Sequence, residues 1–320
     1  MRIGQNPAKY LNEVAKPERI TAAILNFIPF TGGFYTETMD VFKVCLTSLR
    51  KTADFPCDIL VFDNGSCKEV QDELMQMQRE GQIQYLFLSE HNLGKGGAWN
   101  IILAGAPGEI IVYTDSDCLF YPGWLSKSLQ ILETYPQVGM VTARPFRTRP
   151  DYYTKTVEWA ENEPGCILQK GNFIPFEVFR EFDLSLGQSE EEIRQHYDTS
   201  EDVRVSYHGV EAIAGASHWQ FMAYKEVISR FLPFAMDRPM GQVKQLDQRM
   251  NEAGYLRLMP VDPLVMNMSN TLRNVSGFQS GHFGEAKTGG SKKKPLADLP
   301  LIKRPLLSLY DAIFRMYYDR

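Results

Sequence analysis

Two carboxylates follow directly after a short apolar run near the middle of the chain. Asp115 and Asp117 come after residues 110–113, which are Ile, Ile, Val and Tyr. A short apolar run bounded by turn residues is typical of a strand buried on both faces of a parallel sheet. Its carboxyl end is where open α/β sheets bind ligands. Carboxylates this close repel each other unless a cation lies beside them, and oxygen ligands suit Mg²⁺ or Mn²⁺. The pattern predicts a metal site for a phosphorylated ligand, with a solvated acidic turn as the alternative.

Two other loops carry polar residues after expected strands. Asp63 opens an Asp-Asn-Gly-Ser segment, and Asn92, Gly94 and Lys95 belong to a Gly-rich segment, Asn-Leu-Gly-Lys-Gly-Gly-Ala, before a helix. Backbone N–H groups at a helix start can receive a phosphate, and Lys95 can add positive charge. The alternatives are ordinary turn chemistry for Asp63 and a solvent-facing lysine for Lys95. The spacing fits neither a dinucleotide fingerprint nor a P-loop.

The first half of the chain alternates between strand-like and helix-like segments. This alternation predicts an α/β fold with a doubly wound, mostly parallel sheet and helices on both faces. The second half is less regular and predicts loop plus strand at 208–225 and helices at 190–196 and 243–253. The strands expected in the first half are 20–27, 58–62, 83–88, 110–115 and 138–142, and the expected helices are 37–51, 68–80, 97–104 and 122–133.

Composition narrows the class of protein. A net charge of −5 and a pI near 5.7 argue against nucleic acid as a partner. The five cysteines are odd in number and have no CxxC pairing, which favours a reducing compartment over disulfides or a zinc site. The start has no apolar signal-peptide core, and no run approaches the roughly 18 apolar residues that cross a bilayer. We therefore expect a cytoplasmic protein.

The three loop motifs occur in a characteristic order. FDNGS, then NLGKGGAWN, then YTDSD, each after an expected strand, resembles the family 2 glycosyltransferases of GT-A fold. The resemblance covers residues 20–270. It implies a sheet edge that binds a nucleotide-sugar, usually a UDP-sugar, with Mn²⁺ or Mg²⁺. Carried over, Asp63 would accept a hydrogen bond from the donor base, Asp115 would lie beside the ribose and metal-bound waters, and Asp117 would ligate the metal.

The general base departs from the family pattern. The resemblance implies a Glu-Asp pair at a helix start, where this chain has Gln242 and Val243. Asp247 lies four residues after Val243, on the same helix face about one turn further along. We expect Asp247 to be the base, with Asp237 in the preceding loop as the rival.

Three further side chains complete the expected site. The family's histidine after the strand at 264–266 is replaced by Asn267, so His282 in a Gly-rich loop is the candidate metal ligand, unless it is an exposed loop residue. His218 and Trp219 fall where such enzymes bind the acceptor, as a hydrogen-bonding group and a stacking surface. A buried structural role is the equal alternative for both.

The expected domain arrangement follows from these motifs. Residues 1–275 would form the GT-A domain, with a nucleotide-sugar-binding half at 20–145 and an acceptor-binding half at 146–275. Residues 276–320 would add a flexible loop and an amphipathic C-terminal helix. The segment 291–320 carries seven Lys or Arg against three Asp, so it would either contact an anionic membrane surface at the inner face or pack on protein.

The leading hypothesis is a metal-dependent inverting glycosyltransferase, acting on a glycan or lipid-linked acceptor in glycan or polysaccharide assembly. The alternative is a catalytically silent nucleotide-sugar-binding protein on the same fold. A sugar nucleotidyltransferase is disfavoured, because no basic Gly-rich loop follows the first expected strand.

Overall fold

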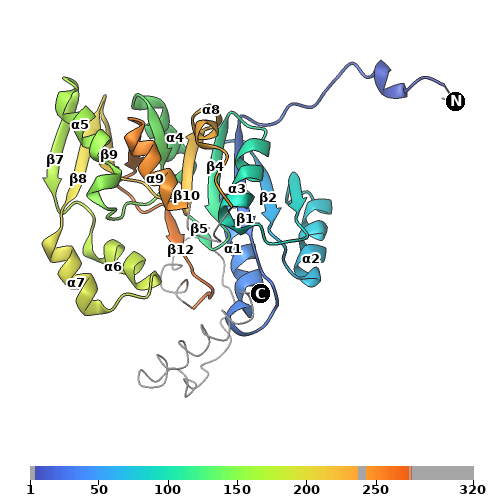
Figure 1. Ribbon diagram of the computed structural model, residues 1–320, viewed down its shortest axis with the longest axis horizontal. Helices are drawn as coiled ribbons and strands as arrows, with labels where there is room; N and C mark the ends of the chain where they lie inside the picture. Colours follow the sequence, from blue (N-terminus) through green and yellow to red (C-terminus); the bar gives the residue numbers. More distant parts are fainter. Residues whose placement is uncertain (1–3, 237–242, 274, 276–320) are drawn as a thin grey trace. The chain divides into compact units, whose positions relative to one another are not determined.

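A ten-stranded mixed sheet, in the order β3-β2-β1-β4-β10-β6-β11-β9-β8-β7, forms the centre of the protein (Figure 1). The computed structural model describes residues 4–236, 243–273 and 275. All of these lie in one compact unit, residues 1–275. The strands are β1 Ile20–Asn26, β2 Cys57–Asp63, β3 Tyr85–Leu88, β4 Ile110–Asp115, β5 Cys118–Phe120, β6 Val138–Val141, β7 Cys166–Gly171, β8 Asp202–Tyr207, β9 Val210–Ala214, β10 Gln220–Tyr224, β11 Leu256–Met259 and β12 Val265–Asn267.

The first four strands in the sheet order, β3, β2, β1 and β4, are parallel to one another. Each crossover between them contains a helix, as parallel pairing requires. The α/β class expected from the sequence is confirmed, and so are the expected strands of this half. The helices are α1 Thr38–Thr52, α2 Lys68–Arg79, α3 Gly94–Gly105, α4 Trp124–Thr134, α5 Thr154–Asn162, α6 Phe176–Ser185, α7 Glu190–Thr199, α8 Lys225–Ile228 and α9 Val243–Glu252.

The second half of the chain contributes antiparallel strands that the sequence did not predict as such. β10 lies antiparallel between β4 and β6, and β7, β8 and β9 form an antiparallel extension at one end of the sheet. A separate two-stranded sheet pairs β12 with β5, directly after the acidic motif. Short buried runs specify burial but not the direction of pairing, so the sheet is more mixed than expected.

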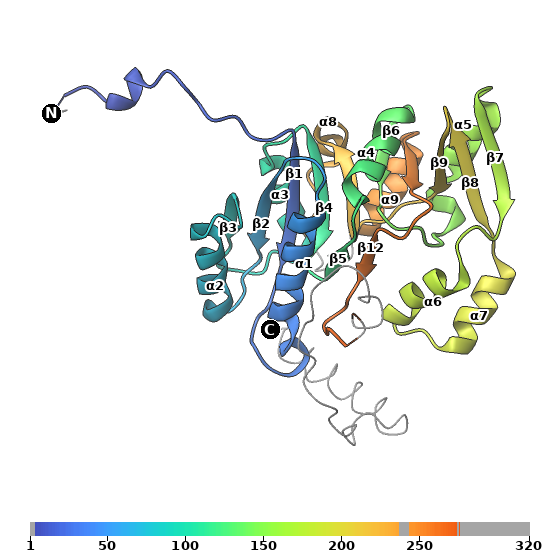
Figure 2. The ribbon, with the colours of Figure 1, turned by 180° about the vertical axis from the view of Figure 1, so that it is seen from behind.

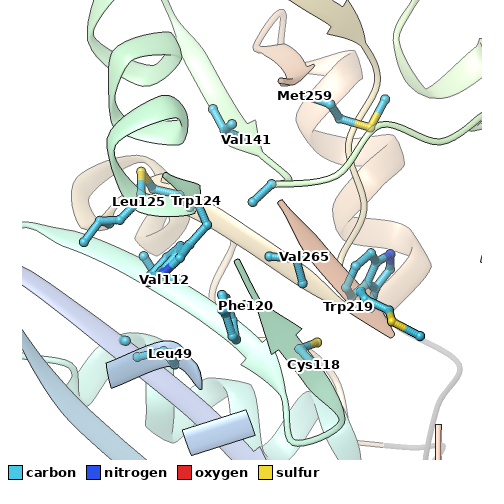
Figure 3. Packing of buried hydrophobic residues seen from close by; sticks show 14 of the residues in the cluster. Leu49, Val112, Cys118, Phe120, Trp124, Leu125, Val141, Trp219, Met259 and Val265 are labelled. Atoms are coloured by element: carbon cyan, nitrogen blue, oxygen red, sulfur yellow. The ribbon is translucent and has the colours of Figure 1, made fainter. Parts of the chain in front are cut away.

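Helices cover both faces of the sheet, with α1, α2 and α4 on one face and α3, α8 and α9 on the other (Figures 1 and 2). The larger apolar cluster lies under α1 and α4 and continues to β5 and β12, as Figure 3 shows for Leu49, Phe120, Trp124 and Val265. The smaller cluster centres on Trp99 of α3. Among the described residues, no helix is long and apolar enough to cross a membrane.

Candidate active site

The sheet brings two of the expected carboxylates to the same edge. β1 lies between β2 and β4, and its last two residues pair with Asp63 on one side and Asp115 on the other. Because these three strands are parallel, both acids lie where the strands end, at the carboxyl edge. Asp117 follows in the turn between β4 and β5. The expectation that these motifs converge in space is therefore confirmed.

Asp115 is held by two side chains of the protein. The Lys95 Nζ lies 2.7 Å from its carboxylate oxygens, and the Tyr113 hydroxyl donates to Oδ1 at 2.5 Å. The Lys95 side chain is only 8% exposed, and its ammonium lies over the rings of Trp99 and Tyr113 at 5.7 and 5.5 Å. Lys95 is thus a buried partner of the acidic motif, and the solvent-facing alternative is wrong.

Asp117 has one carboxylate oxygen without a partner. Its Oδ2 accepts a hydrogen bond of 3.3 Å from Asn267 Nδ2, while its Oδ1 is buried and unpaired. Burial, and next the charge of Asp115, raise the pKa of Asp117 to about 7. A buried carboxylate oxygen without a donor is costly unless it meets a cation or a proton. This oxygen is therefore suited to a divalent cation.

The Asp63 carboxylate accepts several hydrogen bonds in and around its own loop. It is fully buried, and its oxygens accept hydrogen bonds from Asn26 Nδ2 at 3.0 Å, Gln71 Nε2 at 3.1 Å, and both the backbone N–H and hydroxyl of Ser66. The contact of Asp63 with the donor base stays a prediction, and it requires exchange of one of these partners.

The Gly-rich loop packs directly on the Asp63 loop. Asn92 Oδ1 accepts from Gly94 N at 2.8 Å and from Asn64 Nδ2 at 2.9 Å, and α3 begins at Gly94. Gly65 has a φ of +86°, and a Cβ there would lie 2.8 Å from the backbone carbonyl carbon of His91. The two expected donor-binding loops are thus locked together. The binding of phosphate at this helix start stays a prediction.

His218 and Asp247 form a hydrogen-bonded pair, with His218 Nδ1 2.6 Å from Asp247 Oδ2. Asp247 is 4% exposed, and its Oδ1 is ion-paired with the fully buried Arg257. Arg257 also donates to the carbonyl oxygens of Ala216 at 2.5 Å and Tyr152 at 2.7 Å. Burial lowers the pKa of Arg257, while Asp247 opposes that change. Asp247 is therefore engaged on both oxygens, which does not fit its expected role as the base.

Trp219 does not present a stacking surface. The residue is 9% exposed and lies in the core (Figure 3). The Phe182 ring is stacked on it at a centroid distance of 5.8 Å, and the Phe146 ring lies at 6.2 Å. The expectation that Trp219 stacks on the acceptor is wrong, because Phe182 covers the Trp219 ring. Its backbone carbonyl nevertheless accepts from Asp115 N at 2.9 Å, which places His218 next to the acidic motif.

Some expected residues lie outside the described part of the chain, namely Asp237, Gln242 and His282. In the described residues, Arg257 is the functional group that the sequence reasoning missed. Its signal was a charged residue within the otherwise apolar strand β11, Leu-Arg-Leu-Met, where all four residues are buried. A buried charge in a strand implies a buried partner.

The carboxylates of the acidic motif suit a hard divalent cation. Asp117 would bind it with its unpaired oxygen, and Asp115 would bind it while it is also paired with Lys95. Within the described residues, no three His, Cys, Asp or Glu side chains gather around one point. Mg²⁺ and Mn²⁺ commonly use one or two carboxylates and complete their shell with phosphate oxygens and water. The described residues therefore suit a metal that binds together with a diphosphate.

Comparisons with known proteins bear on the family of the chain. Residues 34–185 match the family model described as glycosyl transferase family 2. An uncharacterized glycosyltransferase of Nostoc sp. is 27% identical over 120 residues, which are 36% of this chain and 37% of the relative. The chain thus spans little more than a third of that relative's length. The family resemblance predicted from the sequence is confirmed for residues 34–185.

Two solved structures are similar at low identity. A mannosyltransferase from Pyrobaculum calidifontis in complex with GDP-Man and Mn²⁺ is 17% identical with a TM-score of 0.47, over 79% of this chain and 57% of that chain. S. aureus TarS 1–349 in complex with UDP-GlcNAc is 12% identical with a TM-score of 0.46, over 78% and 57%. GDP-Man, Mn²⁺ and UDP-GlcNAc are ligands of those two proteins.

Proposed function

Because residues 34–185 match the family model of glycosyl transferase family 2, we propose that this protein is a metal-dependent inverting glycosyltransferase. It transfers a sugar from a nucleoside diphosphate donor, with UDP favoured, to a hydroxyl of a glycan or lipid-linked acceptor in glycan or polysaccharide assembly. The observation that carries the proposal is the buried, unpaired Oδ1 of Asp117, beside Asp115 at the carboxyl edge of the parallel strands.

The charges at this edge support binding of a metal-bound diphosphate. Lys95 is 2.7 Å from Asp115, and its charge also acts on Asp117. One ammonium thus faces two carboxylates. The ion would supply positive charge to the departing diphosphate as the glycosidic bond lengthens. Asp117 would hold it directly, with Asp115 at its side. His282 as a further ligand stays a prediction outside the described residues.

The chain's own groups would hold the rest of the donor. The locked pair of loops at Asp63 and Asn92 lies at the carboxyl ends of β2 and β3 and leads into α3 at Gly94. Lys95, one residue into that helix, would meet phosphate oxygens in addition to Asp115. A cytoplasmic location is supported by five free cysteines. Membrane contact of the tail concerns residues outside the described part.

A catalytically silent nucleotide-sugar-binding protein is the second candidate. One observation favours it. At the position where the resemblance implies a histidine, the chain has Asn267, whose amide donates a hydrogen bond to Asp117. This candidate binds nucleotide with metal and neither transfers sugar nor releases nucleoside diphosphate from a donor.

A thermal-shift screen against UDP, GDP, dTDP and CDP, each with Mn²⁺ or with EDTA, tests the proposal. Ligands that bind only the native state raise the melting temperature. We expect one nucleotide to stabilise the wild type with Mn²⁺ and not with EDTA, and Asp117→Asn to abolish that difference. Asp72→Asn, an exposed carboxylate paired with Lys68, is the control. Equal stabilisation of wild type and Asp117→Asn would contradict the metal site.

Release of nucleoside diphosphate distinguishes the two candidates. Wild-type protein with Mn²⁺ and UDP-glucose, UDP-GlcNAc or GDP-mannose should release nucleoside diphosphate slowly to water and faster with a suitable acceptor. Nucleotide binding without any release would instead support the silent binding protein.

A further inference from the structure

The His218 imidazole is held in one orientation at the edge of the candidate site. It sits in the turn formed by the Ser217–Gln220 bridge, immediately before β10. Its Nδ1 lies 2.6 Å from Asp247 Oδ2, and its ring meets Trp99 edge-on at a centroid distance of 6.4 Å. Contacts on two sides therefore set the direction in which the opposite nitrogen, Nε2, points.

The partners of Asp247 determine the tautomer of His218. An ionised carboxylate only accepts hydrogen bonds, and one oxygen of Asp247 already accepts from Arg257. The other oxygen faces Nδ1, so Nδ1 must carry the hydrogen. In the neutral ring, Nε2 is then the basic nitrogen with a free lone pair.

Exposure favours His218 over Asp247 as the group that meets substrate. The His218 side chain is 21% exposed, whereas that of Asp247 is 4% exposed. Since Nδ1 faces a buried carboxylate, the imidazole meets solvent on the side away from Asp247. A base must reach the proton that it removes, and His218 satisfies that condition where Asp247 does not.

The pairing of strands brings His218 to the acidic motif. Gln220 pairs with Thr114, and the Trp219 carbonyl accepts from Asp115 N at 2.9 Å. The charged side chain that contacts the ring is Asp247 of α9, which is itself paired with Arg257 of β11. The backbone that carries His218 thus lies next to the end of β4, one residue before the hydrogen bond to Asp115.

We propose that His218, held by Asp247 and Arg257, is the general base of this enzyme. The inference rests on the proposed glycosyltransferase function. As the acceptor oxygen forms its bond to the anomeric carbon, its proton passes to His218 Nε2. The bond between that carbon and the diphosphate oxygen breaks, and the nucleoside diphosphate leaves with the electron pair. Asp247 is a positioning residue that stabilises the imidazolium, and Arg257 holds Asp247 in place.

Two variants test the two roles. His218→Ala removes the base, and general-base catalysis contributes about 10²- to 10⁴-fold to turnover. Asp247→Asn keeps the shape of the side chain. Because Arg257 is only a donor, the amide oxygen must face Arg257. The amide NH₂ then faces Nδ1 and forces the hydrogen onto Nε2. We expect kcat for nucleoside diphosphate release to fall about 10²- to 10⁴-fold in both, with Mn²⁺-dependent stabilisation by nucleotide retained as the check of folding and donor binding.

Imidazole in the buffer separates a base from a structural residue. Added imidazole should restore turnover in His218→Ala, where it can enter the vacated space, and not in Asp247→Asn, where His218 still fills it. His208→Asn, in the exposed turn between β8 and β9, is the histidine control and should behave as wild type.

The outcomes separate this inference from the function on which it rests. Wild-type protein that binds nucleotide and releases none overturns both. If the wild type is active, two results overturn the assignment of the base alone. One is a His218→Ala variant with the kcat of the wild type, and the other is a His218→Ala variant of low kcat that imidazole does not restore. Loss of kcat in Asp237→Asn with an unaffected His218→Ala would transfer the role to Asp237.

Discussion

Replacement of Lys95 by Met tests the electrostatic design of the candidate site. Met keeps the length and the apolar stem of the side chain and removes the ammonium. Lys95 is 8% exposed, and it pairs with Asp115, which is 28% exposed, at 2.7 Å. In the variant, Asp115 becomes a largely buried carboxylate next to Asp117, with only the Tyr113 hydroxyl as a donor.

The expected loss of stability follows from the burial of the pair. Removal of one partner from a fully buried ion pair costs about 3–5 kcal/mol. Asp115 is partly solvated and keeps one hydrogen bond, so we expect a loss of about 2 kcal/mol, close to the value of one charged hydrogen bond. For a unit of this size the melting temperature should fall by about 3–4 °C.

The assay is urea unfolding, measured once in EDTA and once with added Mn²⁺ and no EDTA. Lys68→Met is the matched control, because Lys68 is 82% exposed and pairs with Asp72 across one helical turn. Such a surface pair contributes less than about 0.5 kcal/mol. Added Mn²⁺ should restore part of the stability of Lys95→Met, since a cation can replace the lost ammonium beside Asp115. A loss no larger than that of Lys68→Met would refute the reasoning.

Two other substitutions test the framework of the site. Gly65→Ala should destabilise the protein by about 1–3 kcal/mol and weaken Mn²⁺-dependent nucleotide binding, because its Cβ would meet the backbone of His91 at 2.8 Å. Gly187 has a similar φ of +84°, but no atom lies within 4 Å of a Cβ built there. Gly187→Ala is therefore the control, and an equal loss of stability in it would exclude the loop contact as the cause. Arg257→Met should cost about 3–5 kcal/mol in urea unfolding, because it leaves Asp247 buried without its cation. The double variant with Asp247→Asn should recover part of that loss, and no recovery would contradict a charge effect.

The local features of the first half of the chain could be predicted from the sequence. Strands such as β1 and β4 are short apolar runs that end at turn residues, and this pattern identifies a buried strand without knowledge of its neighbours. The three loop motifs follow those strands, so their meeting at one edge follows from parallel pairing alone. The family resemblance added the order of the motifs.

The other half depended on contacts between distant segments. β10 enters the sheet antiparallel between β4 and β6, and nothing in its own residues specifies those partners. That insertion places His218 beside Asp115. It also explains why Trp219 is a core residue, since the turn before β10 directs its ring onto Phe182.

By itself, the sequence determined where the acidic motif lies and which strand ends there, because burial and turn propensity are local properties of the chain. Only the tertiary structure decided how the charges are partnered. Lys95 is buried against Asp115, and Asp247 is enclosed by Arg257 and His218. Whether a charged side chain is solvated or buried depends on what packs over it, and those neighbours come from strands and helices far away in the chain.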